Sequence, residues 1–227
     1  TTFEFTDIAG LVKGASKGEG LGNQFLSNIR LTDAICHVVR CFDDADITHV
    51  EGSVDPIRDI EIINLELIMA DLQTIDNRLA KVERKAVTNK DKDALAEVAV
   101  LKKLKEALEA GKPARSVDLD KEELALIKAF SLLTIKPMIY IANMSDEDIA
   151  DPEANPYYQK VKELADSEHN EVVPVCAKIE EELSELDKEE KTEFLNELGI
   201  KESGLDNVIK TAYRILDLCT FLTAGED

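Results

Sequence analysis

Thr2-Phe3-Glu4-Phe5-Thr6-Asp7-Ile8-Ala9-Gly10 joins a run of β-branched and aromatic residues to an Asp-x-x-Gly motif. The run Thr2–Thr6 predicts a β-strand. A carboxylate at a strand end can orient a water molecule on Mg²⁺. A glycine three residues later can bring its backbone N–H close to a terminal phosphate, because it has no Cβ. Asp7 is therefore a candidate for metal contact through water, and Gly10 for phosphate contact.

The segment that follows Gly10 strengthens this interpretation. Gly10–Gly22 contains five glycines in thirteen residues, and an amphipathic pattern over Gly22–Leu31 predicts a helix after it. Such a loop can be ordered by a phosphate group and released after hydrolysis. A flexible linker is the alternative, but a linker does not need the apolar residues that interrupt these glycines.

Three further apolar runs predict strands that are covered on both faces, as in a mostly parallel sheet. They are Ile35–Val39, Met138–Ala142 and Val172–Cys176. Helical patterns over Tyr157–Ser167 and Leu205–Leu218 alternate with them. This order predicts an α/β fold with a doubly wound, mostly parallel sheet.

A long helical insertion separates the second and third of these four strands. Its first part carries apolar residues in steps of three and four, at Leu65, Ile68, Leu72, Ile75, Leu79, Val82 and Ala86. A second seam runs through Ala94, Val98, Leu101, Leu104 and Leu108, and stops near Gly111 and Pro113. The spacing predicts an antiparallel coiled-coil hairpin that projects as an arm. We therefore expect a nucleotide-binding domain of residues 1–45 and 136–227, with residues 46–135 as an inserted helical domain.

Two motifs follow the third and fourth predicted strands. The first motif, Asn143-Met144-Ser145-Asp146, comes directly after Met138–Ala142. The second, Cys176-Ala177-Lys178, begins at the last residue of the run Val172–Cys176. The carboxyl ends of parallel strands are where ligands bind in such sheets. An Asn-x-x-Asp motif at this place can brace a loop and bind a nucleotide base, although an ordinary Asx turn is the alternative.

Together these motifs resemble the Obg-related P-loop NTPases. The switch-like run Asp7–Arg30 carries the general likeness. Val39-Arg40-Cys41-Phe42-Asp43 and His49-Val50 resemble the YchF branch, and the likeness continues to Phe221–Gly225. The resemblance implies a P-loop NTPase core with an inserted coiled-coil domain and a C-terminal TGS domain. It also implies Mg²⁺-dependent hydrolysis of ATP in preference to GTP, and association with ribosomes.

The resemblance also implies roles for individual residues. His49 lies at the place of the family's proposed catalytic histidine. Many GTPases have a glutamine after the switch glycine to orient the attacking water. This chain has Leu11 there, which cannot hydrogen-bond water, whereas an imidazole can. His37 lies inside a predicted strand and is expected to be structural.

Asn143, Met144 and Asp146 are expected to hold the base, with Cys176, Ala177 and Lys178 behind it. Met144 replaces the lysine of GTPases, so apolar packing replaces its charged stem. The YchF relatives usually carry glutamate where this chain has Asp146. An aspartate there suits the N–H donors of guanine, so GTP remains an alternative to ATP.

No GxxxxGK[ST] motif occurs in the sequence, so the lysine and the Mg²⁺-binding Ser/Thr of a P-loop are absent from it. We expect the chain to be a fragment without its P-loop segment and its TGS domain. The sheet should then be split between Thr2–Thr6 and Ile35–Val39. We also expect this segment alone to fold poorly and to be inactive.

The formal net charge of −20 argues against bulk electrostatic binding of a nucleic acid. No apolar run approaches the length of a membrane span, and the N-terminus is not a signal peptide, so we expect a cytoplasmic protein with no direct membrane contact. Three functions fit: an ATPase or GTPase, a nucleotide-switched module that binds a ribosome or translation factor with little hydrolysis, and a structural coiled-coil protein. The order of the motifs argues against the last.

Overall fold

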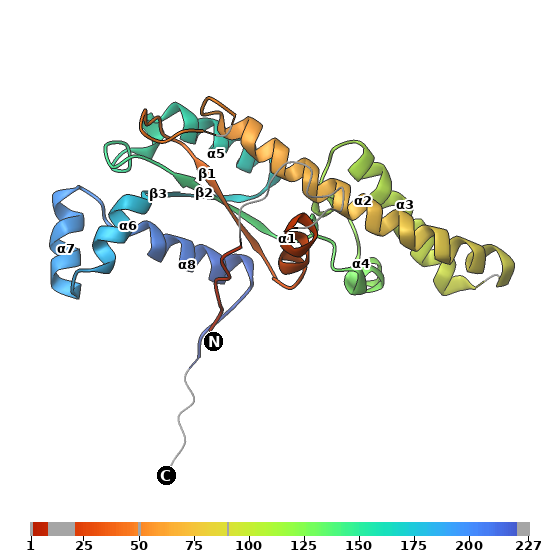
Figure 1. Ribbon diagram of the computed structural model, residues 1–227. Coiled ribbons are helices and arrows are strands. Elements are labelled where there is room, and N and C mark those ends of the chain that lie inside the picture. Colours follow the sequence, from red (N-terminus) through yellow and green to blue (C-terminus); the bar gives the residue numbers. More distant parts are fainter. Residues whose placement is uncertain (1, 9–20, 50, 90, 222–227) are drawn as a thin grey trace, which may run out of the picture. The chain divides into compact units, whose positions relative to one another are not determined.

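The computed structural model describes residues 2–8, 21–49, 51–89 and 91–221 (Figure 1). Its contacts divide the chain into two compact units. The sheet unit comprises Thr1–Phe5, Ala34–Ile60 and Met138–Asp227. The helical unit comprises Thr6–Asp33 and Glu61–Pro137.

The sheet unit is built on three parallel strands in the order β1-β2-β3 (Figure 1). They span Ile35–Arg40 (β1), Met138–Asn143 (β2) and Glu171–Val175 (β3). The register runs from Ile35 opposite Met138 to Arg40 opposite Asn143. The parallel sheet and the positions of the three strands predicted from the sequence are therefore confirmed. The prediction that all three are covered on both faces is wrong for β1, where Val38 is 62% exposed.

The predicted strand Thr2–Thr6 is wrong, because these residues form neither a strand nor a helix. A strand needs a partner whose backbone completes its hydrogen bonds, and no described strand pairs with this segment. Phe3 instead packs edge-on against Tyr213, with ring centroids 5.2 Å apart. Because Thr2–Thr6 is not a strand in this structure, the split expected between it and Ile35–Val39 is not tested.

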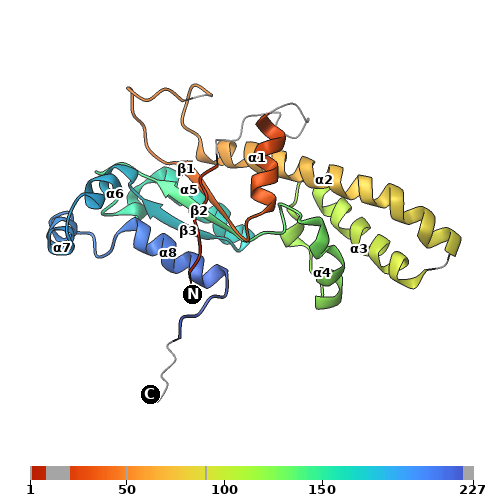
Figure 2. The same cartoon turned by 60° about the horizontal axis from the view of Figure 1, so that its bottom comes forward.

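Helices α5 (Pro156–Glu168) and α8 (Gly204–Ile215) cover opposite faces of this sheet (Figures 1 and 2). Side chains alternate between the faces of a strand. Ile139 accordingly packs with Val208 and Ala212 of α8. Its neighbour Tyr140 is fully buried, and its hydroxyl donates to Glu168 of α5 at 2.7 Å. The doubly wound arrangement follows directly from this alternation.

Two shorter helices, α6 (Ala177–Ser184) and α7 (Lys188–Glu197), complete the sheet unit between β3 and α8. Gly204, the first residue of α8, lies against β3. A Cβ there would be 3.0 Å from Val175 Cγ2. The missing side chain therefore allows the close approach of α8 to the strand.

The helical unit contains α1 (Leu21–Arg30), most of α2 (Pro56–Asn89), α3 (Lys92–Glu109) and α4 (Lys121–Ile127). Single 3₁₀ turns lie at Ala114–Ser116 and Lys128–Phe130 of this unit, and at Pro152–Ala154 of the sheet unit. The helices predicted at Gly22–Leu31 and around both seams are confirmed. α3 ends at Glu109, and Gly111, whose φ of 75° favours glycine, follows two residues later, which confirms the predicted stop near this glycine.

α2 and α3 lie side by side as a helical hairpin (Figure 2). Their buried residues form one core with α4, and the hairpin members are Ile68, Ile75, Leu79, Val82, Ala86, Ala94, Val100, Leu101, Leu104 and Leu108. The seam begins later than predicted, because the Leu65 side chain is 54% exposed.

A buried carboxylate joins α2 to the segment that leads into β2. Asp71 is 0% exposed. It accepts hydrogen bonds from the backbone N–H of Leu133 at 2.8 Å, and from the N–H and hydroxyl of Thr134, both at 2.7 Å. Burial raises the pKa of the Asp71 carboxyl, and these donors act in the opposite direction. Asp71 thereby fixes a contact between residues 62 positions apart in the sequence.

The boundaries of the compact units differ from those expected for the domains. Asp46–Ile60 groups with the sheet unit, whereas the sequence placed it in the insertion from residue 46 onward. Thr6–Asp33 groups with the helices, because Leu26 and Ile29 of α1 are buried and Arg30 bonds within that unit, to Thr74 and Ser131.

Candidate functional site

Asn143 is the centre of a hydrogen-bonded edge at the carboxyl ends of the strands. Its side-chain oxygen accepts from the backbone N–H of Ala177 at 3.1 Å, and its carbonyl accepts from the N–H of Cys41 at 2.8 Å. The N–H of Met144 donates to the carbonyl of Val175 at 2.8 Å. The motif after β2 is thus joined to the motif after β3 and to the residue after β1.

Two residues expected at the base have buried side chains in this structure. Met144 is 2% exposed and Cys176 is 3% exposed. Cys176 belongs to an apolar cluster with Ile179 and Leu183, and burial raises the pKa of its thiol. Neither side chain presents a free surface, so contacts at these positions would be made by the backbone or after a side-chain movement.

Asp146 and Lys178 form an ion pair across the two motifs, at 2.5 Å. The pairing lowers the pKa of the Asp146 carboxyl and raises that of the Lys178 ammonium. Both side chains are largely exposed, so the pair contributes little to stability. The pair matters instead for ligand binding, because the Asp146 carboxylate already has a cationic partner.

Arg40, the last residue of β1, holds the loop that leads toward His49. Its guanidinium donates to the carbonyls of Phe42, Asp44 and Ile47 at 3.0, 3.3 and 3.1 Å. The sequence analysis did not predict that Arg40 holds this loop. An arginine at the end of a mostly apolar strand was the signal that could have pointed to it.

Asn155 is a second brace that the sequence analysis missed. It is 5% exposed, and its amide donates to the Cys41 carbonyl at 3.1 Å and to Asp148 at 2.8 Å. Its side-chain oxygen also caps α5. An asparagine directly before Pro156 is a helix-start signal that could have pointed to it.

His49 lies in the loop between β1 and α2, within the sheet unit. Its Nε2 is 2.9 Å from Asp59 Oδ2, and its Nδ1 accepts from the backbone N–H of Glu51 at 3.1 Å. Because β1 is parallel to β2, this loop leaves the same edge of the sheet as the motif at Asn143.

Asp7 belongs to the helical unit and has an exposed side chain outside any helix or strand. Gly10 lies outside the described residues. An exposed single carboxylate fits a contact to Mg²⁺ through water. Among the residues that the structure describes, no group of three or more His, Cys, Asp or Glu is arranged to hold a metal ion directly.

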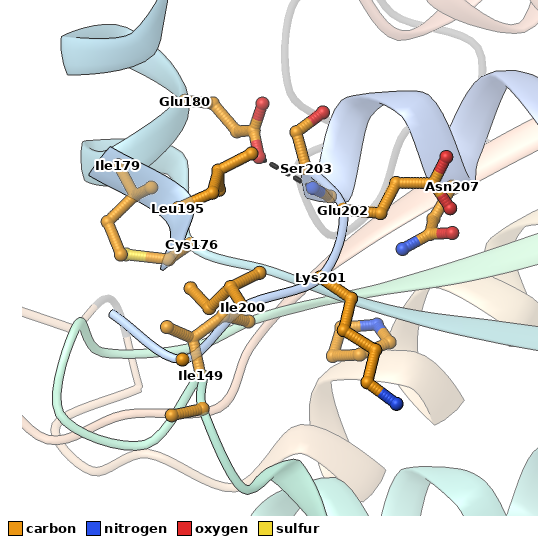
Figure 3. Close-up of a pocket in the computed structure, with 14 residues that line it drawn as sticks. Ile149, Cys176, Ile179, Glu180, Leu195, Ile200, Lys201, Glu202, Ser203 and Asn207 are labelled. Carbon is orange, nitrogen blue, oxygen red and sulfur yellow. Dashed lines mark hydrogen bonds between the residues drawn. The ribbon is translucent and has the colours of Figure 1, made fainter. Parts of the chain in front are cut away.

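A cavity of about 360 Å³ lies beside the motif at Cys176 (Figure 3). Ile149, Cys176, Ile179, Leu195 and Ile200 make its apolar side, while Lys201, Ser203 and Asn207 contribute polar groups. The N–H of Gly204 donates to Glu180 at 2.7 Å at its rim. Cys176 is the residue shared by this cavity and the edge at Asn143.

His37 lies partly buried in β1, with its Nδ1 atom buried, beside the Tyr140 ring at a centroid distance of 5.8 Å. Among the described residues its Nδ1 has no hydrogen-bond partner. Burial lowers the pKa of His37 from 6.5 to about 4, and the Asp59 charge acts in the opposite direction. These observations fit the structural role expected from its place in a strand.

The lowered pKa of His37 predicts a loss of stability in mild acid. The unfolded chain binds the proton below pH 6.5 and the folded protein only near pH 4, so stability falls as the pH drops through this window. The loss attributable to His37 at pH 5 is about 2 kcal/mol relative to pH 7.5. Urea unfolding of the wild type and of His37→Phe at both pH values measures it. His169→Asn is the control, since His169 is exposed and asparagine tolerates its positive φ. Equal pH dependence in the wild type and His37→Phe would contradict the prediction.

Three parallel strands with helices on both faces, and the Asn143 motif at their carboxyl edge, define an α/β domain of the nucleotide-binding class. Comparison with known families gives the particular one. The family described as 50S ribosome-binding GTPase matches residues 1–195, and the chain belongs to it. Among the described ranges, no helix combines the length and apolarity that a bilayer span requires.

Similar proteins place the chain among homologues of YchF. The ribosome-binding ATPase YchF of Bacillus subtilis (strain 168) is 59% identical over 226 residues, which are 100% of this chain and 62% of that protein. That of Mycoplasma pneumoniae is 44% identical, again over 100% of this chain and 62% of the relative. The solved structure of the Schizosaccharomyces pombe YchF GTPase matches with a TM-score of 0.81 and 38% identity, over 95% of this chain and 58% of that one. The chain thus spans about three fifths of the length of the relatives it matches.

Proposed function

We propose that the protein containing this chain is a ribosome-associated NTPase that hydrolyses ATP to ADP. The supporting observation is the edge at Asn143, where one amide oxygen binds the N–H of Ala177 and so holds the two base-contacting loops together. The carboxyl ends of parallel strands are the expected place for a nucleotide. The YchF relatives are named as ribosome-binding ATPases, which agrees with this proposal.

In the proposed site, Asn143, Met144 and Asp146 hold the base, with Cys176, Ala177 and Lys178 behind them. Gly10 would contact the terminal phosphate, and Asp7 would hold Mg²⁺ through a water molecule. The metal ion neutralises phosphate charge when it is bound with the nucleotide. His49 orients the attacking water. Catalysis in this class consists largely of positioning and charge stabilisation.

The ion pair between Asp146 and Lys178 favours ATP over GTP. Guanine recognition at this position needs a carboxylate that is free to accept from the N–H donors of the base. Lys178 neutralises this carboxylate, so a guanine would have to displace it, whereas adenine has no such requirement.

Calorimetric titration of the intact protein with ATP and GTP tests this assignment. We expect ATP to bind up to about fivefold more tightly, because an exposed ion pair contributes at most about 1 kcal/mol. Lys178→Met should narrow the ratio, because it leaves the Asp146 carboxylate without its partner. Lys201→Met, at the cavity beside Cys176, is the matched control and should leave the ratio unchanged. GTP binding as tight as ATP binding in the wild type would contradict the proposal.

The charge of the two units supports the helical hairpin as the ribosome-facing part. By sequence, the sheet unit has 10 Lys and Arg against 30 Asp and Glu, whereas the helical unit has 17 of each. The whole formal charge of −20 is therefore assigned to the sheet unit. A neutral unit with exposed basic side chains, such as Lys81, Arg84 and Lys92, is repelled less by RNA phosphates.

A nucleotide-switched binding module with little hydrolysis is the second candidate function. The hairpin and the run Gly10–Gly22 would then be its working surfaces. Sedimentation of the intact protein with ribosomes in ATP, in ADP and without nucleotide separates the two functions. Association that is the same in all three conditions argues against a switch. A ribosome-associated protein of either kind is expected in the cytoplasm.

A further inference from the structure

Both ring nitrogens of His49 are engaged in the described structure. Nδ1 accepts a hydrogen bond from the backbone N–H of Glu51 at 3.1 Å. A nitrogen that accepts an N–H carries a lone pair, so the proton of the neutral ring is on Nε2. Nε2 then donates to Asp59 Oδ2 at 2.9 Å. The surroundings of His49 thus select one tautomer.

Asp59 is itself held in place by several contacts. Arg58 binds its other oxygen, Oδ1, through Nε at 3.1 Å and Nη2 at 3.0 Å. The same guanidinium donates to the Ser53 carbonyl at 2.7 Å, so it also ties the loop to the start of α2. Asp59 lies in the first turn of α2, where the helix dipole favours a carboxylate. The carboxylate that faces His49 is therefore fixed in direction.

The amide of Glu51 occupies the one lone pair of the ring. The turn that carries it closes when the N–H of Gly52 donates to the His49 carbonyl at 3.0 Å, and Gly52 has a φ of 80°. The hydrogen bond from Glu51 N–H to His49 Nδ1 is exposed, whereas the bond between His49 Nε2 and Asp59 is partly buried. The acceptor on Nδ1 is thus the more accessible of the two contacts.

We propose that Asp59 is a positioning residue for His49, and that Nδ1 is the atom that accepts from the attacking water. Asp59 keeps the proton on Nε2, so the lone pair of Nδ1 is available in the right tautomer. The Glu51 amide occupies that lone pair in this structure, so the attacking water has to displace the amide from Nδ1. An aspartate that fixes the tautomer of a catalytic histidine works in this way in hydrolytic triads. This inference rests on the proposed role of His49 in hydrolysis.

The direct test is ¹⁵N NMR of histidine-labelled intact protein. The wild type should show a protonated Nε2 and an unprotonated Nδ1 for His49, assigned with His49→Gln. Asp59→Asn should weaken this preference, because an amide can donate to Nε2 as well as accept from it. Protonated Nδ1 in the wild type, or an unchanged tautomer in Asp59→Asn, would overturn the proposal. The wild-type measurement needs no variant to fold.

Turnover provides the second readout. We expect Asp59→Asn to lower kcat by about tenfold or more with KM nearly unchanged, as for a residue that orients a base. Asp55→Asn is the matched control in the same loop. Asp55 accepts from the backbone N–H of Arg58 at 3.2 Å, so asparagine removes the same charge and can keep this N-cap bond. The kcat of Asp55→Asn should be unchanged. If His49→Ala loses turnover and Asp59→Asn does not, the role of Asp59 is refuted and the proposed function stands. If His49→Ala keeps full turnover, the catalytic role of His49 fails, and this inference fails with it.

Discussion

Replacing His49 by alanine in the intact protein is expected to lower the turnover of ATP by about 100-fold, with ATP affinity almost unchanged. General acid–base groups contribute about 10² to 10⁴ in rate. In the proposed site Leu11 follows Gly10 and cannot orient water, so the imidazole of His49 is proposed for that role. In the structure the ring bonds to Asp59 and the Glu51 amide, and neither belongs to the base-contacting set at Asn143. His49→Ala should therefore lower the rate of turnover without changing the affinity for ATP.

Single-turnover hydrolysis measures the rate of ATP turnover, and calorimetric titration measures the affinity for ATP. His169→Asn is the matched control, because it removes an exposed histidine at the end of α5 that bears no relation to the edge at Asn143. Its turnover should equal that of the wild type. Normal turnover in His49→Ala would remove the histidine from the mechanism, and a parallel loss of ATP affinity would indicate a role in binding.

Replacing Asp71 by alanine is expected to destabilise the helical unit by about 4 kcal/mol. The substitution leaves three donors without an acceptor, on Leu133 and Thr134, and each unsatisfied buried group costs about 1–3 kcal/mol. Removing a buried charge offsets part of this loss. The cost is local, because Asp71 joins α2 only to the segment around Thr134.

Hydrogen exchange of peptides from α2 and α3 in the intact protein measures this local loss, because it reports the free energy of opening segment by segment. The matched control on the same helix is Asp76→Ala. Its carboxylate is exposed and pairs with Lys105 at 2.6 Å, so its removal should cost less than about 1 kcal/mol. If hydrogen exchange in Asp71→Ala is the same as in Asp76→Ala, the Asp71 carboxylate does not stabilise the helical unit as predicted.

The elements that could be predicted are those whose cause is local in the sequence. The apolar runs of β1 to β3 indicate strands of a parallel sheet, although Val38 of β1 is exposed. The stop near Gly111 needs only a residue that tolerates positive φ. The short helices α4 and α7 were missed, although Asp120 with Glu123 and Asp187 with Glu190 form capping boxes that are readable from sequence.

The errors have a different cause, because they depend on partners elsewhere in the chain. Thr2–Thr6 has the composition of a strand, but no described strand supplies its hydrogen bonds. Leu65 fits the heptad spacing and is nevertheless exposed, because the buried seam of the hairpin begins at Ile68.

The sequence by itself determined the parallel α/β core, the helical hairpin and the candidate positions Asn143, Lys178 and His49. Periodicity, strand ends and motif order are properties of consecutive residues, so they can be read without coordinates. Only the tertiary structure decided that Lys178 neutralises Asp146, that Asp71 binds the backbone at Thr134, and that Asp59 holds His49. These contacts join residues 10 to 63 positions apart, and no local pattern specifies which side chains the folded chain brings within hydrogen-bond distance.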